Sequence, residues 1–222
     1  MLLAIDTSTR VVGVALYDGV QVISEVVWIS QDYHTVELAP AVDLTLSKSD
    51  INVSDIKAIA IATGPGSYTG LRIGLAFGKG LSLVGQKSIV GIPTFDILAA
   101  AQPVVGKQMV TVLRAGRGRL AVGWYRPNGD QWESVDKTEV ITPQELSAQI
   151  TRPTLVCGEL TADERRLLGR KRKKVVLASP ARSIRRPSFL AELGWERWIS
   201  DLVDDPVTLS PIYLHQNKPI PG

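Results

Sequence analysis

The chain has 222 residues, of which 45% are hydrophobic, and its 25 Lys and Arg against 22 Asp and Glu give a formal net charge of +3. This length and apolar content suffice for one large domain or two small ones, and the longest apolar runs end well before the roughly 18 residues that span a membrane. The opening MLLAIDTST has no basic segment and soon meets Asp6, so we expect no signal peptide. The single cysteine, Cys157, excludes an intramolecular disulfide and favours a cytoplasmic location.

The first half of the sequence predicts alternating strands and helices. Apolar segments that turn at Asp18-Gly19 predict three antiparallel strands. A helical period follows, and then buried strands separated by helices, the last with Thr94 as its N-cap. The resulting order is βββαβαβα: we expect strands at residues 2–6, 11–17, 20–29, 56–62 and 88–91, and helices at 33–47, 70–84 and 94–101.

The second half repeats this theme after a predicted boundary at Gln102-Pro103. The division gives a first domain of residues 1–102 and a second of residues 103–222. Thr142 is expected to cap a helix that has Pro143 at its first position. We expect strands at residues 109–113, 120–125, 132–140, 154–157 and 175–178, and helices at 143–150, 162–168 and 188–202.

The segment GPGSYTGLRIGLAFGKG at residues 64–80 combines a glycine-rich loop with a glycine-bearing helix. The amides of such a helix start attract anions, but the residues that define a P-loop or a dinucleotide fingerprint are missing. Gly70, Gly74 and Gly78 recur every four residues, so they lie on one stripe of the helix. Each costs about 1 kcal/mol relative to alanine. Close packing within the fold, a protein partner or an approaching phosphate could each compensate for this cost.

A basic block extends from Arg165 to Arg186, with ten Lys or Arg residues and no acid. It is either a solvated basic face or a surface for a polyanion such as RNA. No aromatic residue lies inside the block, so it offers no platform for base stacking. The candidate RNA-facing residues are Arg170, Lys171, Arg172, Lys173 and Lys174.

Several motifs together resemble the TsaB family, bacterial proteins needed to make threonylcarbamoyladenosine in tRNA. They are DTSTRVVGVALYDG at the N-terminus, HTVEL, the glycine-rich segment at 64–80, and IVGIPTFDILAA. The resemblance is dense over residues 1–101 and thinner beyond. It implies an α/β fold of the actin-like ATPase (ASKHA) type, built from two subdomains of βββαβα type. It further implies a non-catalytic scaffold that binds the catalytic subunit TsaD, works with the ATPase TsaE, and forms a homodimer when alone.

The resemblance places the partner interface on the helices at 33–47 and 70–84. The residues expected there are His34, Leu38, Val42, Arg72, Ile73, Phe77 and Leu81. The catalytic sibling has a histidine pair for a metal, whereas the matching segment 91–98 has none, and the histidines of this chain are His34 and His215. We therefore expect no metal, no cofactor and no catalytic residue.

The loops where active members of the fold approach nucleotide phosphates are expected to be vestigial here. They contain Asp6, Thr7, Ser8, Gly64 and Gly66. Asp6 either links to Mg²⁺ or caps the turn between its strands. The alternative function is an ATP-dependent phosphotransferase that binds nucleotide between the subdomains.

One segment departs from the family pattern. Arg114 and Arg119 stand where acids are usual, which makes that surface more basic and raises the prospect that the second subdomain contacts tRNA.

Overall fold

The computed structural model describes residues 1–31 and 34–214, apart from the side chains of residues 136 and 137. The chain forms two compact units. Unit 1 consists of Met1–Ile97 and Arg185–Ile212, and the described part of unit 2 consists of Leu98–Ile184 and Tyr213–Leu214. The chain first passes from unit 1 to unit 2 between Ile97 and Leu98, whereas the sequence predicted the boundary at 102/103. In addition, the segment Arg185–Ile212 returns to unit 1, which sequence reasoning did not foresee.

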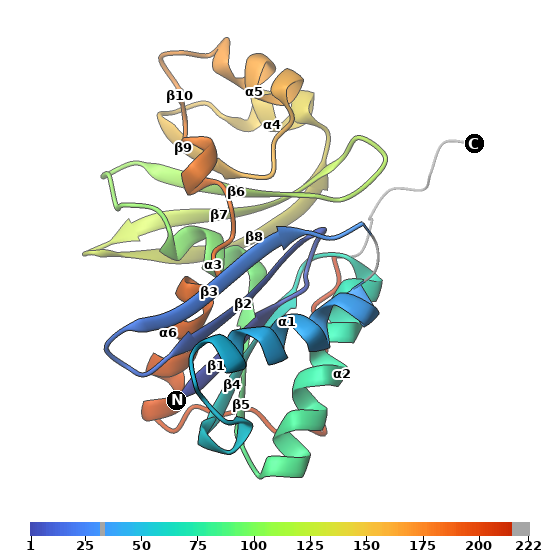
Figure 1. Ribbon diagram of the computed structural model, residues 1–222. Coiled ribbons are helices and arrows are strands. Elements are labelled where there is room, and N and C mark those ends of the chain that lie inside the picture. The colour runs from blue at the N-terminus through green and yellow to red at the C-terminus, as the bar shows by residue number, and fades with distance from the viewer. Residues whose placement is uncertain (32–33, 215–222) are drawn as a thin grey trace. The chain divides into compact units, whose positions relative to one another are not determined.

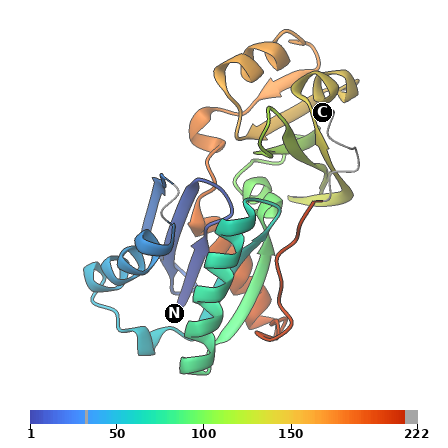
Figure 2. The same cartoon turned by 90° about the vertical axis from the view of Figure 1, so that its right-hand side faces the viewer.

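Unit 1 is a five-stranded mixed sheet with helices on both faces (Figures 1 and 2). The strand order is β3-β2-β1-β4-β5; β1 pairs antiparallel with β2 and parallel with β4. The predicted order of elements is confirmed. The elements are β1 (Leu2–Asp6), β2 (Val11–Tyr17), β3 (Val22–Ile29), α1 (His34–Lys48), η1 (Val53–Asp55), β4 (Ala58–Gly64), α2 (Tyr68–Gly85), β5 (Ser88–Pro93), α3 (Thr94–Ala100), which leads into unit 2, and α6 (Pro187–Ile199).

The side chains of β1 alternate between two apolar cores, because successive residues of a strand point to opposite faces. Leu3 and Ile5 pack on the side that α1 and α2 cover. Leu2 and Ala4 pack on the other side, with Leu190 of α6. The sheet is thus buried on both faces, and α6 from the far end of the chain covers the second face together with Ile97 of α3.

Two close approaches hold α6 against the sheet. Gly13 of β2 leaves room for the ring of Pro187, and Gly194 of α6 leaves room for Ala60 of β4. Glu25 of β3 adds polar contacts at the start of the helix: its carboxylate accepts hydrogen bonds from the amide of Ser188, at 3.0 Å, and from Arg186. The long return of the chain is therefore tied to both the middle and the edge of the sheet.

Glu25 gives the stability of unit 1 a dependence on pH. Burial acts to raise the pKa of Glu25, but the hydrogen bonds from Arg186 and Ser188 outweigh it and leave the pKa below its ordinary value. A carboxyl whose folded pKa is lowered stabilises the fold above its unfolded pKa, and this contribution is lost as pH falls through the folded pKa. We expect Glu25→Gln to lower the free energy of unfolding at pH 7 and to match the wild type increasingly below about pH 4, as measured by urea unfolding. A difference that is constant across pH would contradict this assignment.

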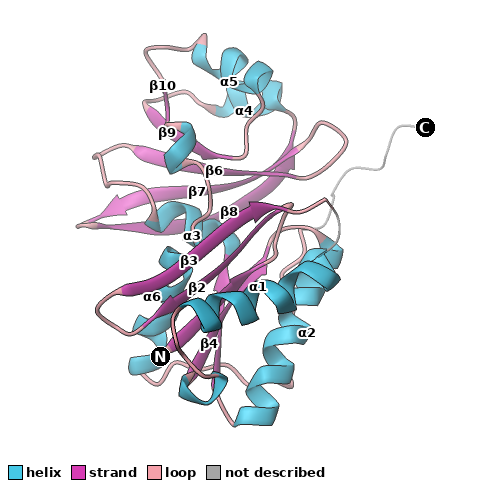
Figure 3. Ribbon diagram, in the orientation of Figure 1, coloured by secondary structure: helices cyan, strands magenta, loops and turns pink. Residues whose placement is uncertain are grey.

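Unit 2 repeats the strand arrangement of unit 1, with the order β10-β9-β6-β7-β8 (Figure 3). The β6 strand pairs antiparallel with β7 and parallel with β9. The duplication seen in the sequence pattern is thus confirmed as one of topology. The elements are β6 (Gln108–Arg114), β7 (Leu120–Asn128), β8 (Gln131–Ile141), α4 (Pro143–Gln149), β9 (Thr154–Gly158), α5 (Ala162–Gly169), β10 (Val175–Leu177) and η2 (Pro180–Arg182).

Two expected helix caps have different outcomes. Thr142 caps α4 as predicted, because its hydroxyl accepts a hydrogen bond from the Glu145 amide and the Glu145 carboxylate accepts one from the Thr142 amide. The prediction that Thr94 caps α3 is wrong. Thr94 is itself the first residue of the helix, and its hydroxyl accepts a hydrogen bond from the amide of Gly64, 3.1 Å away. The Thr94 hydroxyl thus stabilises the start of the glycine-rich loop instead of the start of α3.

The expected start of the first helix, Tyr33, lies outside the described residues, as does His215. No helix in the part of the chain that the structure describes is long and apolar enough to cross a bilayer.

Candidate functional site

Two loops meet at the carboxyl ends of neighbouring strands in unit 1. The turn after β1 contains Asp6, Thr7 and Ser8, and the loop after β4 contains Gly64 and Gly66. Parallel pairing of Ile5 with Ile61 brings these strand ends together. Ligands of open α/β sheets bind at such ends. This is therefore the place to look for a nucleotide site.

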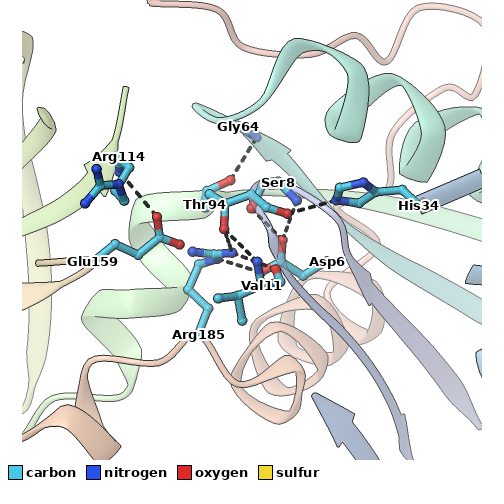
Figure 4. A network of polar contacts seen from close by, with 10 residues as sticks. Asp6, Ser8, Val11, His34, Gly64, Thr94, Arg114, Glu159 and Arg185 are labelled. Atoms are coloured by element: carbon cyan, nitrogen blue, oxygen red, sulfur yellow. Dashed lines mark hydrogen bonds and ion pairs between the residues drawn. The ribbon is translucent and has the colours of Figure 1, made fainter. Parts of the chain in front are cut away.

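The Asp6 carboxylate is buried and fully engaged by the protein itself (Figure 4). Its Oδ1 accepts hydrogen bonds from the amide of Ser8, at 2.8 Å, and from the Ser8 hydroxyl. Its Oδ2 lies 2.8 Å from Nε of Arg185. Both side chains of the ion pair are almost fully excluded from solvent, at 0% exposed for Arg185 and 3% for Asp6. The structure therefore favours turn capping over the alternative in which Asp6 links to Mg²⁺.

Arg185 does more than neutralise Asp6. Its Nη2 donates to the hydroxyl of Thr9, at 2.6 Å, and to the carbonyl oxygen of Val11, at 2.9 Å. One guanidinium thus ties the first residues of the returning segment to both sides of the turn after β1. Sequence reasoning missed this role because Arg185 lies inside the basic block and resembles its solvated neighbours. Its only signal in the sequence is a proline two residues later, which marks the start of α6.

The glycine-rich loop and the first turns of α2 lie directly against the turn after β1. A Cβ at Gly66 would overlap the carbonyl oxygen of Ser8, and one at Gly70 would overlap that of Thr7. Further along the helix, a Cβ at Gly74 would overlap the Thr7 hydroxyl, which donates to the Gly70 carbonyl at 2.8 Å.

A third helix glycine, Gly78, lies against the side chain of Ile61. Packing within the fold therefore accounts for the whole glycine stripe of α2.

The same packing uses the amide groups that could otherwise bind a phosphate. The amide of Ser67 donates to the Ser8 carbonyl, at 2.6 Å, and the amide of Gly70 donates to the Ser67 hydroxyl, at 3.3 Å. The amide of Gly64 is bonded to Thr94. These three amides therefore donate to oxygen atoms of the protein itself rather than to a ligand.

The residues expected at a partner interface fall into two groups. Three of them belong to the core or its polar edge: Leu38 and Val42 pack against the sheet, and Nε2 of His34 lies 3.0 Å from the carbonyl oxygen of Thr9. The others lie on α2, where Arg72 is exposed and Ile73, Phe77 and Leu81 are half-buried. The accessible members of the set are therefore on α2 alone.

Three further residues considered from the sequence, Cys157, Arg114 and Arg119, lie in unit 2. Burial raises the pKa of the Cys157 thiol to about 12, so it behaves as a small apolar side chain. Arg114 lies 3.9 Å from Glu164, and Arg119 lines an open recess beside α4. Among the described residues, no three His, Cys, Asp or Glu side chains are grouped as they would be around a metal ion.

Comparison with known proteins assigns the family. A family profile described as TsaD, tRNA N6-adenosine threonylcarbamoyltransferase, matches residues 22–167. The chain is also 31% identical, over 208 residues and 90% of each sequence, to the tRNA threonylcarbamoyladenosine biosynthesis protein TsaB of Bacillus subtilis. The chain belongs to the TsaB family. It is 32% identical to TsaB of Escherichia coli over 148 residues, which is 64% of this chain and 63% of the relative.

A solved structure agrees with this assignment at the level of the fold. YeaZ from Pseudomonas aeruginosa superposes with a TM-score of 0.78 at 22% identity, covering 96% of this chain and 99% of that one. The chain itself has two α/β units of βββαβα type whose five-stranded sheets share one strand order. The resemblance drawn from the sequence motifs is thus confirmed for the family and for the two-unit α/β fold.

Proposed function

We propose that this TsaB-family chain is a non-catalytic scaffold in tRNA threonylcarbamoyladenosine synthesis, which binds the catalytic subunit TsaD through α2. Its cellular setting is the cytoplasm, TsaE is a further partner, and the free chain forms a homodimer through the same helix. The names of its relatives support the pathway. The internal pairing of Asp6 with Arg185 supports the absence of nucleotide chemistry at the strand ends.

The composition of α2 is the observation that carries the proposal. Only two of its 18 residues, Arg72 and Lys79, are charged, although one side of the helix faces outward. That side consists largely of small and apolar residues, with Ala76 and Gly80 exposed and Leu83 64% exposed. A surface helix ordinarily carries charged residues opposite its core face. A helix that is apolar nearly all round fits one that is covered by a partner.

The partner proposed to cover α2 is TsaD. TsaD belongs to the same family profile that matches this chain, so a corresponding helix of TsaD can pack against α2, as neighbouring helices do in a bundle. Small residues such as Ala76 and Gly80 permit a close crossing of two helices. Because His34, Leu38 and Val42 are enclosed by the fold, they would support α1 from within and leave the contact to α2.

The substitution Ala76→Arg tests this surface without disturbing the core. Ala76 is exposed and arginine is a good helix former, so the fold should be retained. We expect the wild type to be a homodimer that exchanges into a heterodimer with TsaD of the same organism, as measured by light scattering. The variant should be monomeric and should bind TsaD at least about 10-fold more weakly, a loss of ~1.4 kcal/mol.

Ile199→Arg is the matched control, because Ile199 is 65% exposed at the end of α6, on the opposite face of the sheet. It should dimerise and bind TsaD as the wild type does. If Ala76→Arg is folded and still forms both complexes, the α2 surface is not the interface. If the wild type ignores TsaD and gains thermal stability from ATP with Mg²⁺, a phosphotransferase replaces the scaffold.

A further inference from the structure

Cations from three segments that are far apart in the sequence lie together in unit 2, along the edge formed by the amino-terminal ends of three parallel strands. The strands β6, β9 and β10 are parallel neighbours, and Gln108 and Val175 both pair in register with Thr154. Their starts therefore lie side by side. Lys107 immediately precedes β6, Arg152 precedes β9 by two residues, and the turn at residues 170–174 leads into β10.

The turn before β10 is a fixed structure rather than a loose basic loop. The amides of Lys174 and Val175 donate to the carbonyl of Lys171, at 2.7 and 2.9 Å. The ammonium group of Lys171 points inward and binds the carbonyl oxygens of Ser147 and Ile150 at the end of α4. One of the five cations expected to face RNA thus holds the turn in place. The others, Arg170, Arg172, Lys173 and Lys174, are exposed.

Arg152 is also held in position by neutral groups. Its Nε donates to the side-chain oxygen of Gln108, and the Gln108 amide nitrogen donates to the hydroxyl of Thr154, at 2.6 Å. This small network bridges the starts of β6 and β9. It orients the guanidinium and leaves its charge uncompensated.

No carboxylate within the described residues pairs with the six exposed cations of this edge, namely Lys107, Arg152, Arg170, Arg172, Lys173 and Lys174. The neighbouring Arg126, at the end of β7, is different because it is neutralised by Glu133, 2.6 Å away. We call these six residues the basic edge. Its excess of positive charge results from the meeting of three acid-free segments, of which the basic block supplies only one.

We propose that the basic edge binds the phosphate backbone of RNA. Lys and Arg that release counterions from phosphates supply sequence-independent affinity. Beside Arg152 lies an open recess of about 540 Å³ whose lining includes Trp124, Tyr125 and Gln108. Single-stranded RNA is recognised through unstacked bases and aromatic side chains. Trp124 and Tyr125 are themselves almost fully buried, so the recess adds the polar groups of Gln108 and Arg152 rather than a stacking surface. The row of six cations, which no carboxylate among the described residues pairs with, is therefore the feature that favours a phosphate backbone.

This inference goes beyond the scaffold function, which requires no contact with RNA; only the choice of tRNA as probe rests on it. The test compares the full-length wild type with the triple variant Arg172→Gln, Lys173→Gln and Lys174→Gln, leaving Lys171 in place. Binding to unfractionated bacterial tRNA is measured by fluorescence anisotropy between 50 and 200 mM salt, a range over which phosphate contacts weaken strongly. We expect at least about 10-fold weaker binding at the lowest salt and a salt slope reduced by about 2–3.

A control variant removes three cations from unit 1: Lys48→Gln, Lys57→Gln and Lys79→Gln. It has the same net charge as the triple variant and should retain tRNA affinity within about twofold and the full salt slope. Equal losses in both variants, or none in either, would overturn the proposal. Unchanged tRNA binding combined with lost TsaD binding in the triple variant would also overturn it, because the edge would then serve an acidic protein. Ala76→Arg should leave tRNA binding unchanged. Failure of the scaffold proposal can therefore be distinguished from failure of the RNA-binding proposal.

Discussion

Arg185→Met is expected to lower the free energy of unfolding by about 3–5 kcal/mol, because it leaves the charge of Asp6 buried without a partner. Methionine fills much of the volume of arginine, so the loss reports the electrostatics and the hydrogen bonds to Thr9 and Val11. Arg185→Lys keeps the charge but cannot reproduce the planar hydrogen bonds, and it should give an intermediate loss. Urea unfolding followed by circular dichroism measures each change. A loss of this size is a large fraction of the total stability of a typical domain.

The control for this prediction is Arg182→Met, which changes an exposed arginine in the same basic block. Its effect should lie within about 0.5 kcal/mol, as is usual for surface substitutions. The double variant Asp6→Asn with Arg185→Met should be less destabilised than the sum of the two single variants, because the pair is coupled. Strict additivity, or equal effects of Arg185→Met and Arg182→Met, would contradict the assignment of Arg185 as the buried partner of Asp6.

Gly70→Ala is expected to destabilise the chain by about 1–3 kcal/mol, although alanine is the better helix former. The added methyl group would overlap the carbonyl oxygen of Thr7, and a backbone atom cannot move away without displacing the turn after β1. Gly78→Ala meets the end of the Ile61 side chain instead, which can rotate, so its loss should be smaller. Thermal or urea unfolding of the two variants gives the order.

Gly80→Ala provides the opposite control on the same helix. An added Cβ at Gly80 meets no atom within 4 Å, and the residue is exposed. This variant should therefore gain up to about 1 kcal/mol from helix propensity alone. If Gly70→Ala is also stabilising, the close approach of the turn to α2 is not rigid, and the glycine stripe has another cause.

Much of the fold could be predicted because its signals are local. The apolar strand segments, the Asp18-Gly19 turn and the Thr142 cap each depend on a few neighbouring residues, and the structure has all three. Thr94 was misassigned because a hydroxyl that suits a helix start also suits the amide of a neighbouring loop, and only the packed structure shows which one it binds. Likewise, the family resemblance placed Leu38 and Val42 at a partner interface, and only the packed structure shows that the sheet covers them.

The candidate site shows the same division between local and long-range information. The sequence by itself determined the order of elements, the family, the glycine stripe and the basic block, because these depend on residue type and spacing along the chain. Only the tertiary structure decided that Arg185 neutralises Asp6 across a separation of 179 positions, and that Lys107 and Arg152 extend the charge of residues 170–174. Such pairings arise where the returning α6 and the parallel strands bring distant segments together. A local sequence pattern cannot predict these pairings, because the residues around each partner give no sign of the other.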